Sequence, residues 1–350
     1  MCKFIKAENA GNDYLYSFEK PWRKSRIIAL CSRRFGAGAD GAVFIQKQNG
    51  AYFLRIFNAD GSEADFCGNA CITAAKLIYD FGLSKRFRFC LQTRAKKVEA
   101  EILNGFSVIK TDGAKLKKPT PAENLLLNKL RAISGVEYVG IFFAGNLHLT
   151  IKTSDLSHLS RGFTNALIKI VNSCGVFKGG INVEFFCPSF SGLRGSAAAE
   201  ELCSVNQGGA PDGKIADGVN AVVYERGSDY TYSCGSGALA VFACYNLCVR
   251  SVFGLSVKYK GGVLTVQRCK NCENCENCEN SGCLKYSERL RRCDGYENGF
   301  CEKSARENTN FIKLIGTPET IYFGSVLKNG YANCLCGAFE KGFAGEENAD

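Results

Sequence analysis

The sequence predicts an α+β protein of two pseudo-symmetric domains, each a β-sheet wrapped around a central helix. Three observations lead to this prediction. The two halves share an internal repeat, short strand-like runs dominate both halves, and each half has an apolar helical run directly after a Cys-Gly pair. A chain of 350 residues also suits two domains that each bury a core of their own.

The repeat pairs short motifs from the two halves. NAGNDY, which contains Asn12, is matched by FAGNLH, which contains Asn146. CGNA begins with Cys67, and its counterpart CGSG begins with Cys234. The interval from Asn to Cys is 55 residues in the first half and 88 in the second. Residues 187–218 are rich in Gly, Ser and Ala and explain the surplus, so we expect a long surface insertion there.

Strand-like runs with apolar, β-branched and aromatic residues recur through the chain. They read YFLRIF, FRFCLQT, VEAEIL, YVGIFF, HLTIK, INVEFF, NAVVYE and LSVKYK. The first predicted helix covers residues 69–81 and stops at Gly82. The second is apolar nearly all round and runs almost to Gly254, a pattern that indicates a buried helix.

A second insertion is expected at residues 268–308, because strand-like runs of one domain stand on both sides of it. The seam between the domains is expected near KLKKPTP. We therefore predict one domain from residues 1–117 plus 310–350. The other covers 118–309 and contains both insertions.

Charge and composition narrow the class of protein. Residues 1–118 hold 21 Lys and Arg against 11 Asp and Glu, which accounts for the whole net charge of +10. These charges form no helical stripe or aromatic-interleaved patch, so a solvated surface is favoured over nucleic-acid binding. The N-terminal stretch lacks the apolar core of a signal peptide, and no 18-residue apolar run occurs. The expected location is the cytoplasm.

The 20 cysteines are then expected to be free thiols rather than disulfides. Seven of them lie between Cys269 and Cys301. Others sit on apolar runs and are expected to be small core residues. These are Cys90, Cys174, Cys244 and Cys248.

Four cysteines stand at three-residue intervals in the string CKNCENCENCEN, namely Cys269, Cys272, Cys275 and Cys278. Such a set can hold Zn or an iron–sulfur cluster. The near-perfect Cys-Glu-Asn repetition favours a low-complexity expansion instead. The set is kept as a zinc candidate, while no metal is expected at the main site.

The two Cys-Gly pairs place a thiol at the mouth of each predicted helix. Free N–H groups there lower a thiol pKa and bind carboxylates. Asn69 and Ser236 are expected as the N-cap residues. Two such thiols, one on each face of a substrate α-carbon, would support racemisation or epimerisation. A redox-active cysteine pair is less favoured than an acid–base pair, because neither cysteine has a local C-x-x-C partner.

With these residues in view, the sequence resembles the diaminopimelate epimerase family over nearly its whole length apart from the insertions. The resemblance is carried by GNDY, FGAGADG, RIFNADGSE, CGNA, GNLH, NVEFF, ERG and CGSGA, in that order. It implies an active site in the cleft between the domains, with Cys67 and Cys234 as the acid–base pair and no cofactor. It also implies that His148 and Glu225 lie beside the thiols. The implied substrate contacts are Asn12, Asn58, Gly68, Asn69, Asn146, Asn182, Glu225, Arg226, Gly235 and Ser236.

The implied activity is interconversion of LL- and meso-2,6-diaminopimelate, in lysine and peptidoglycan precursor synthesis. The expected partner is a small-molecule substrate, with no nucleic acid or membrane; a homodimer is left open. The chain departs from the usual family pattern in four places. Ala70 replaces a Gly, Ile72 an Arg, Leu147 a Pro, and Gly41 the Gln common in bacterial members.

Two other functions stay open at this point. One is a proline racemase-like activity, although those relatives carry His after the first Cys-Gly where this chain has Asn69. The other is a Cys-rich metal-binding or nucleic-acid-binding protein, which would rest on the Cys triplets and the basic first half.

Overall fold

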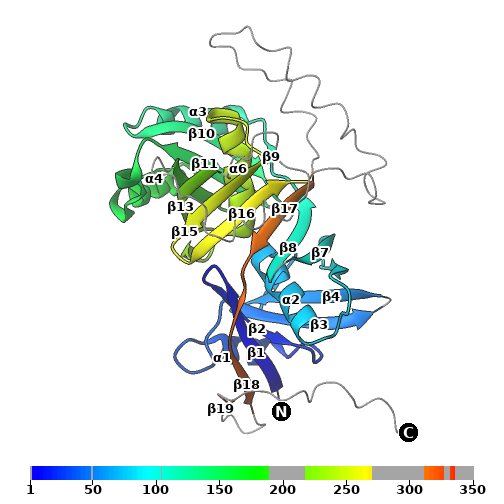
Figure 1. Ribbon diagram of the computed structural model, residues 1–350. Coiled ribbons are helices and arrows are strands. Elements are labelled where there is room, and N and C mark those ends of the chain that lie inside the picture. Colours follow the sequence, from blue (N-terminus) through cyan, green and yellow to red (C-terminus); the bar gives the residue numbers. More distant parts are fainter. Residues whose placement is uncertain are drawn as a thin grey trace, which may run out of the picture. The chain divides into compact units, whose positions relative to one another are not determined.

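The chain folds into two compact units of mixed α and β structure. A computed structural model describes residues 2–48, 50–103, 105–188, 217–269, 311–326 and 332–335. Contacts divide the chain into Met1–Ile109 with Gly316–Asp350, and Lys110–Ile315. The predicted two-domain α+β class is confirmed (Figure 1). The domain limits expected at residues 117 and 309 remain predictions.

Within the described residues, the first unit is a sheet with two helices. Its helices are α1 (Lys24–Cys31) and α2 (Gly68–Asp80). Its strands are β1 (Cys2–Asn9), β2 (Asn12–Ser17), β3 (Gly41–Gln48), β4 (Ala51–Asn58), β5 (Glu63–Ala64), β6 (Arg88–Gln92), β7 (Lys97–Leu103), β18 (Glu319–Val326) and β19 (Ala332–Leu335). Strand β8 (Phe106–Asp112) contains the division between the units.

The second unit repeats this plan with more helix. Its helical segments are α3 (Pro121–Arg131), a short 3-10 turn η1 (Leu156–Leu159), α4 (Arg161–Ser173) and α6 (Gly235–Cys248). Its strands are β9 (Lys115–Leu116), β10 (Val136–Phe143), β11 (Leu147–Thr153), β12 (Asn182–Pro188), β13 (Asp217–Glu225), β14 (Asp229–Thr231), β15 (Gly254–Tyr259), β16 (Gly262–Arg268) and β17 (Phe311–Gly316).

Strand pairing shows that the sequence repeat is a structural repeat. In the first unit β1–β2 is antiparallel, β2–β3 parallel, β3–β4 antiparallel, β4–β6 parallel and β6–β7 antiparallel. In the second unit β10–β11, β11–β12, β12–β13, β13–β15 and β15–β16 follow the same succession. A short strand, β5 or β14, pairs with the fourth strand of each series. Each short strand leads into the helix that follows the Cys-Gly pair.

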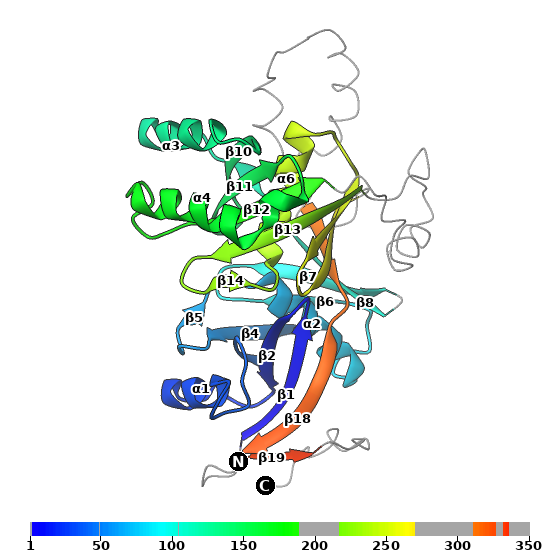
Figure 2. The same ribbon diagram turned by 90° about the vertical axis from the view of Figure 1, so that its left-hand side faces the viewer.

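That helix is the buried centre of each unit, as predicted. Helix α2 contacts β1, β2, β3 and β7, and α6 contacts β9, β10, β11, β12, β15 and β16. In the second unit α3 and α4 cover the opposite face of the sheet from α6 (Figure 2). The sheet is therefore sandwiched, and side chains that point toward α6 are shielded from water on both sides.

All eight predicted strand-like runs overlap observed strands, although FRFCLQT, INVEFF and LSVKYK extend past them by a residue at one or both ends. The second helix was predicted too long, because it ends at Cys248 rather than near Gly254. There the Asn246 side chain accepts the Val252 N–H at 2.8 Å and fixes the chain in a turn. Helices α1, α3 and α4 were not predicted. Helix α3 had a readable start, since Thr120 and Glu123 form a capping box around Pro121.

Strand alternation decides which side chains reach the central helix. In β11, Leu149 and Ile151 join the core beneath α3 and α4, whereas His148 lies on the other face. In β12, Val183 joins the same core, and Glu184 points toward α6, where a Cβ at Gly237 would meet its carboxyl oxygen at 2.2 Å. Polar residues thus alternate with apolar ones in the buried strands.

The expectation that four scattered cysteines are core residues is only partly right. Cys244 is buried in α6, Cys90 and Cys248 are half-buried, and Cys174 is exposed at the end of α4. Cys174 follows an amphipathic helix whose apolar face ends at Val171, so it falls on the solvent side.

Both predicted insertions lie mostly outside the described residues, but the strands that flank them pair with each other. Pro188 is the register partner of Val219 across β12 and β13. Arg268 is the partner of Ile312 across β16 and β17. Each insertion therefore joins neighbouring antiparallel strands.

Replacing residues 269–310 with a four-residue turn containing Asn-Gly should preserve the fold. The flanking strand ends are adjacent, and closing a short hairpin costs little entropy. The melting temperature should change by less than about 5 °C. A control deletion that also removes the buried Ile312 and Leu314 should melt much earlier. Equal destabilisation by both deletions would contradict this account.

Candidate active site

Both helix-mouth cysteines are themselves the N-cap residues. Cys67 precedes α2 with φ −141° and ψ 119°, and Cys234 precedes α6 with φ −138° and ψ 119°. The expectation that Asn69 and Ser236 are N-caps is therefore wrong, since both lie inside the first helical turn. The helices start at Gly68 and Gly235, directly after the thiols. Both cysteines have extended backbone, but only the Cys234 side chain accepts a hydrogen bond from the first turn of its helix, whereas Cys67 makes no side-chain cap hydrogen bond.

Three polar groups surround the Cys234 thiol. The Gly237 N–H donates to Sγ at 3.3 Å, so sulfur takes the place of a capping oxygen. The thiol donates to Glu225 Oε2 at 3.6 Å, and Ser236 Oγ lies at 3.4 Å. The second carboxylate oxygen of Glu225 accepts a hydrogen bond from Thr231. A proton on Cys234 therefore has a defined acceptor, and a thiolate there has a backbone donor.

Burial dominates the ionisation of Cys234. It raises the thiol pKa well above its usual value, and the nearby Glu225 and Glu184 carboxyls raise it further. Ser236 and the Gly237 N–H act in the opposite direction but do not outweigh these effects. The sequence-based expectation of a lowered pKa is thus wrong for Cys234, because it considered the helix end without the burial.

His148 lies close to this thiol in a hydrogen-bond chain that runs from the buried Glu184 to the partly buried Asn146. Its Nδ1 is 3.0 Å from Glu184 Oε1, and its Nε2 is 2.7 Å from Asn146 Oδ1. Both His148 and Glu184 are inaccessible to solvent. Asn146 joins the chain from the turn between β10 and β11, and His148 and Glu184 are brought close by the parallel pairing of β11 with β12.

Burial makes both partners neutral near pH 7. It lowers the pKa of His148 to about 4, although Glu225 works against this shift. It raises the pKa of Glu184 well above its usual value. A neutral imidazole with its proton on Nε2 donates to Asn146, which leaves Nδ1 as an acceptor for the protonated Glu184 carboxyl. This arrangement satisfies both ring nitrogens without a buried charge.

The same cluster has the donor types of a metal site. One ligand atom each from His148, Glu184 and Cys234 lies within 4.8 Å of the others. Imidazole, carboxylate and thiolate all bind zinc. Here, however, the His148 imidazole is hydrogen-bonded to the Glu184 carboxyl. The Cys234 thiol is hydrogen-bonded to Glu225 and to the Gly237 N–H. The contacts therefore form a proton-holding network.

Asn182 and Arg226 meet at a neighbouring point of the second unit. Asn182 Oδ1 accepts the Arg226 backbone N–H at 2.9 Å. The exposed Arg226 guanidinium donates to the Gly179 carbonyl at 3.2 Å. A Cβ at Gly180, which has φ +73°, would approach Arg226 Cγ to 2.8 Å. The glycine pair thus gives the arginine room to extend along this turn.

The Cys67 thiol of the first unit has different neighbours. The Tyr14 hydroxyl donates to Sγ at 3.6 Å, and the thiol lies 3.8 Å from Asn12 Oδ1. Asn69, two residues into α2, is buried and accepts a hydrogen bond from the Asn9 side chain at 3.1 Å. Asn12 and Asn69 therefore both border the start of α2, and the Asn69 side chain is tied to the sheet.

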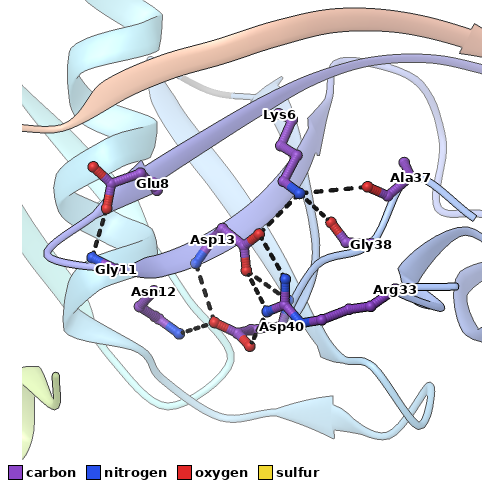
Figure 3. A network of polar contacts seen from close by, with 9 residues as sticks. All are labelled: Lys6, Glu8, Gly11, Asn12, Asp13, Arg33, Ala37, Gly38 and Asp40. Carbon is purple, nitrogen blue, oxygen red and sulfur yellow. Dashed lines mark hydrogen bonds and ion pairs between the residues drawn. The ribbon is translucent and has the colours of Figure 1, made fainter. Parts of the chain in front are cut away.

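A network of charged side chains holds Asn12 (Figure 3). Asn12 Nδ2 donates to Asp40 Oδ2 at 2.9 Å, and Arg33 bonds to both Asp40 and Asp13. Lys6 pairs with Asp13 at 3.0 Å. Burial alone would raise the pKa of Asp13, but hydrogen bonds from Arg33 and Lys6 lower it below its usual value. Burial and the Asp13 charge raise the pKa of Asp40.

Asn58 is exposed at the end of β4. Its Nδ2 donates to Ser62 Oγ at 3.0 Å, and its backbone N–H donates to the Ser62 carbonyl at 2.8 Å. Its side chain therefore takes part in the turn to β5.

Of the four zinc candidates, only Cys269 lies within the described residues, where it is half-buried. Cys272, Cys275 and Cys278 lie outside the described residues.

Two groups beside the thiols were missed at the sequence level. Glu184 was visible within NVEFF as an acidic residue in an apolar strand, a signal of a buried carboxyl. Tyr14 was visible two residues after Asn12, but nothing in its pattern distinguishes a hydroxyl beside a thiol from an ordinary strand tyrosine.

Sequence comparison finds diaminopimelate epimerases as relatives over most of the chain. A family profile described as "Diaminopimelate epimerase" matches residues 11–117. A diaminopimelate epimerase of Acetivibrio thermocellus is 30% identical over 77% of this chain and 91% of its own length. One from Leptospira biflexa is 25% identical over 77% of this chain and 92% of its own length.

Solved structures show the same fold at low identity. A phenazine biosynthesis protein of the PhzF family from Bacillus anthracis has a TM-score of 0.60 at 13% identity, covering 93% of this chain and 99% of its own. A probable proline racemase from Agrobacterium radiobacter has a TM-score of 0.55 at 10% identity, covering 94% and 93%.

The repeated fold and the sequence relatives define an isomerase of the epimerase and racemase class. Within that class, the chain belongs to the diaminopimelate epimerase family. No helix in the described part of the chain is long and apolar enough to cross a membrane. The cytoplasmic location, the absence of a nucleic-acid partner and the homodimer remain predictions.

Glu184→Gln should gain stability relative to the wild type as the pH rises. A carboxyl whose pKa is raised by folding stabilises the native state below its unfolded pKa, near 4.5, and loses that contribution as the pH rises. The neutral amide of Gln can donate to His148 Nδ1 at every pH. The difference in unfolding free energy, measured by urea titration from pH 5 to 8, should therefore increase with pH.

Glu123→Gln is the matched control in the same unit. Burial tends to raise the Glu123 pKa, but hydrogen bonds from Lys117 and Thr120 lower it overall. The wild type should then be the more stable form at pH 7, with an advantage that disappears as the pH falls below about 4. If Glu184→Gln behaved like this control, the neutral pairing with His148 would be disproved.

Proposed function

We propose that this protein interconverts LL- and meso-2,6-diaminopimelate by two-base proton transfer at the α-carbon. Cys67 and Cys234 are the two bases. Relatives named diaminopimelate epimerase support this reaction. The family resemblance implies that it would serve lysine and peptidoglycan precursor synthesis. It would proceed without an added cofactor.

The observation that carries this proposal is the matched setting of the two cysteines. Each is the N-cap of the central helix of its unit, with backbone angles that agree within 3°. Each follows the short strand that pairs with the fourth strand of the repeated series. A structural thiol needs no such correspondence. Two acid–base groups that act on one carbon require matched settings, because the reaction is nearly symmetrical about that carbon.

The proton balance is simple. One cysteine, as thiolate, takes the α-proton and becomes a thiol. The electron pair of the broken C–H bond stays on the substrate carbon, which becomes a carbanion. The other cysteine, as thiol, donates its proton to the opposite face of that carbon and becomes a thiolate. The N–H groups at the start of α2 and α6 would bind the substrate carboxylate and stabilise the charge that develops on it. Atoms and charge are conserved, and only the configuration changes.

Supporting groups differ between the two thiols. Glu225 accepts a hydrogen bond from the Cys234 thiol, and His148 and Asn146 form a hydrogen bond nearby. The exposed Arg226 and the carboxamide of Asn182 suit the distal carboxylate and ammonium of diaminopimelate. We place Asn12, Asn58, Gly68, Asn69, Gly235 and Ser236 around the rest of the substrate on the strength of the family resemblance.

Two of the four departures from the family pattern lie at the start of α2. Ala70 and Ile72 are fully buried, so the place that is usually Arg is filled here by an apolar side chain. The Ala70 carbonyl accepts a hydrogen bond from Tyr16 at 3.4 Å. Leu147 is half-buried at the beginning of β11. These changes affect packing beside the site and leave both thiols in place.

Proline racemase-like activity is the alternative. The Agrobacterium radiobacter structure supports it by fold alone, at 10% identity. Asn69 stands where the resemblance to proline racemases would require His, and all the relatives cited by sequence are named diaminopimelate epimerases. Proline is therefore a useful control substrate.

Purified protein with reduced thiols should convert LL-diaminopimelate to the meso isomer without pyridoxal phosphate. Chiral separation of the amino acids measures the product. L-proline in a parallel assay should remain unchanged. Racemisation of proline with no change in diaminopimelate would support the proline racemase-like activity instead. A requirement for pyridoxal phosphate would exclude the two-thiol mechanism.

Cys67→Ser and Cys234→Ser should each reduce epimerisation at least about 10³-fold, because a serine hydroxyl is a far weaker base than a thiolate at neutral pH. Cys174→Ser is the control, since Cys174 is exposed at the end of α4 and should be dispensable. Circular dichroism should show all three variants folded. Near wild-type turnover in either active-site variant would refute the assignment.

A further inference from the structure

Tyr14 places a hydroxyl beside a proposed catalytic sulfur. It lies in β2, is 5% exposed, and donates to Cys67 Sγ at 3.6 Å. The next tyrosine on the same face of the strand, Tyr16, bonds instead to the Ala70 carbonyl. The two rings pack edge to face with centroids 6.2 Å apart. Packing thus buries the Tyr14 ring and its hydroxyl lies within hydrogen-bond distance of the thiol.

Gly41 makes the room for this ring. It is the register partner of Tyr14 across the parallel pair β2 and β3. A Cβ at Gly41 would approach Tyr14 Cε1 to 2.7 Å and the Phe57 carbonyl oxygen to 2.0 Å. Bulkier residues at this position are therefore incompatible with Tyr14 as it stands. The Phe57 carbonyl and the Tyr14 ring together therefore leave space only for glycine at this departure from the common family pattern.

The internal repeat gives Tyr14 a counterpart. Asn12 corresponds to Asn146, so Tyr14, two residues later, corresponds to His148. Tyr14 and His148 each begin the parallel pairing of their strand with its neighbour, and each lies near the thiol at the start of its unit's central helix. The first unit thus has a phenol where the second has an imidazole.

We propose that Tyr14 is a further catalytic residue of the first half of the site, whose hydroxyl donates a hydrogen bond to the Cys67 thiolate and holds that base in its charged form. This role rests on the proposed function of Cys67. The pair Tyr14 and Gly41 then replaces, in one unit, the support that His148 and its neighbours give in the other.

The charge state of Tyr14 suits a donor. Burial raises its pKa well above the usual value, and the neighbouring Cys67, Tyr16 and Asp40 raise it further. The phenol therefore keeps its proton throughout the range in which a thiol ionises. Of the other groups that surround the thiol, Asn12 is uncharged, and Cys71, one turn further along α2, is a fully buried thiol whose pKa burial raises well above its usual value.

Tyr14→Phe removes this donor and keeps the ring. The rate of Cys67 alkylation by iodoacetamide, followed by peptide mass spectrometry from pH 6 to 10, reports its thiolate fraction in the intact protein without substrate. Loss of a hydrogen bond to a charged group should raise the apparent pKa by about 1 and slow alkylation at pH 7 about tenfold. Epimerase turnover should fall by a similar factor in the direction that uses Cys67 as base.

Tyr16→Phe is the matched control, because it removes a buried hydroxyl from the same strand face without removing a bond to the thiol. It should leave the Cys67 alkylation profile unchanged. An unchanged profile in Tyr14→Phe, or equal shifts in both variants, would overturn the proposal. Since alkylation requires no substrate, a wild-type protein that fails to epimerise diaminopimelate would refute the proposed function and leave this measurement decisive for the hydrogen bond.

Discussion

The unpaired N–H groups at the start of a helix are the constraint around which each unit is built. A helix buried on almost all sides cannot satisfy its first N–H groups with water, so the protein must supply acceptors. In α6 the acceptor is the Cys234 sulfur, which takes the Gly237 N–H. A thiol in this position is both a structural cap and a group that the helix end stabilises as an anion. Stability and acid–base chemistry therefore depend on the same contact.

The polar groups near each thiol follow from how the strands meet the central helix. In the second unit, alternation along β11 and β12 places His148 and Glu184 on the α6 side, and the same burial that neutralises them keeps the pair hydrogen-bonded. In the first unit, the corresponding face holds Tyr14, and charge is gathered further out in the network of Lys6, Asp13, Arg33 and Asp40. One topology thus supports two different environments for the same functional group.

Much of this arrangement could be predicted from the sequence, and the failures have physical causes. The repeat, the strands and the two central helices were visible because apolar periodicity and the Cys-Gly pairs are local signals. Helices α1 and α4 were missed because their residues carry no clear cap, although α3 had one. The ionisation of Cys234 was predicted in the wrong direction because burial depends on tertiary packing. The partnership of Tyr14 with Gly41 links residues 27 positions apart and needs the strand register to be seen.

The central claim, that two cysteines act on one carbon from opposite faces, is tested most directly by the fate of the α-proton. LL-diaminopimelate is incubated with the protein in D2O, and both isomers are recovered after a small fraction has converted. With one base on each face, the meso product should carry one deuterium at the inverted carbon, and the recovered LL substrate should carry none. Deuterium entering the recovered substrate as fast as the product would show that a single group both removes and returns the proton, and would contradict the account.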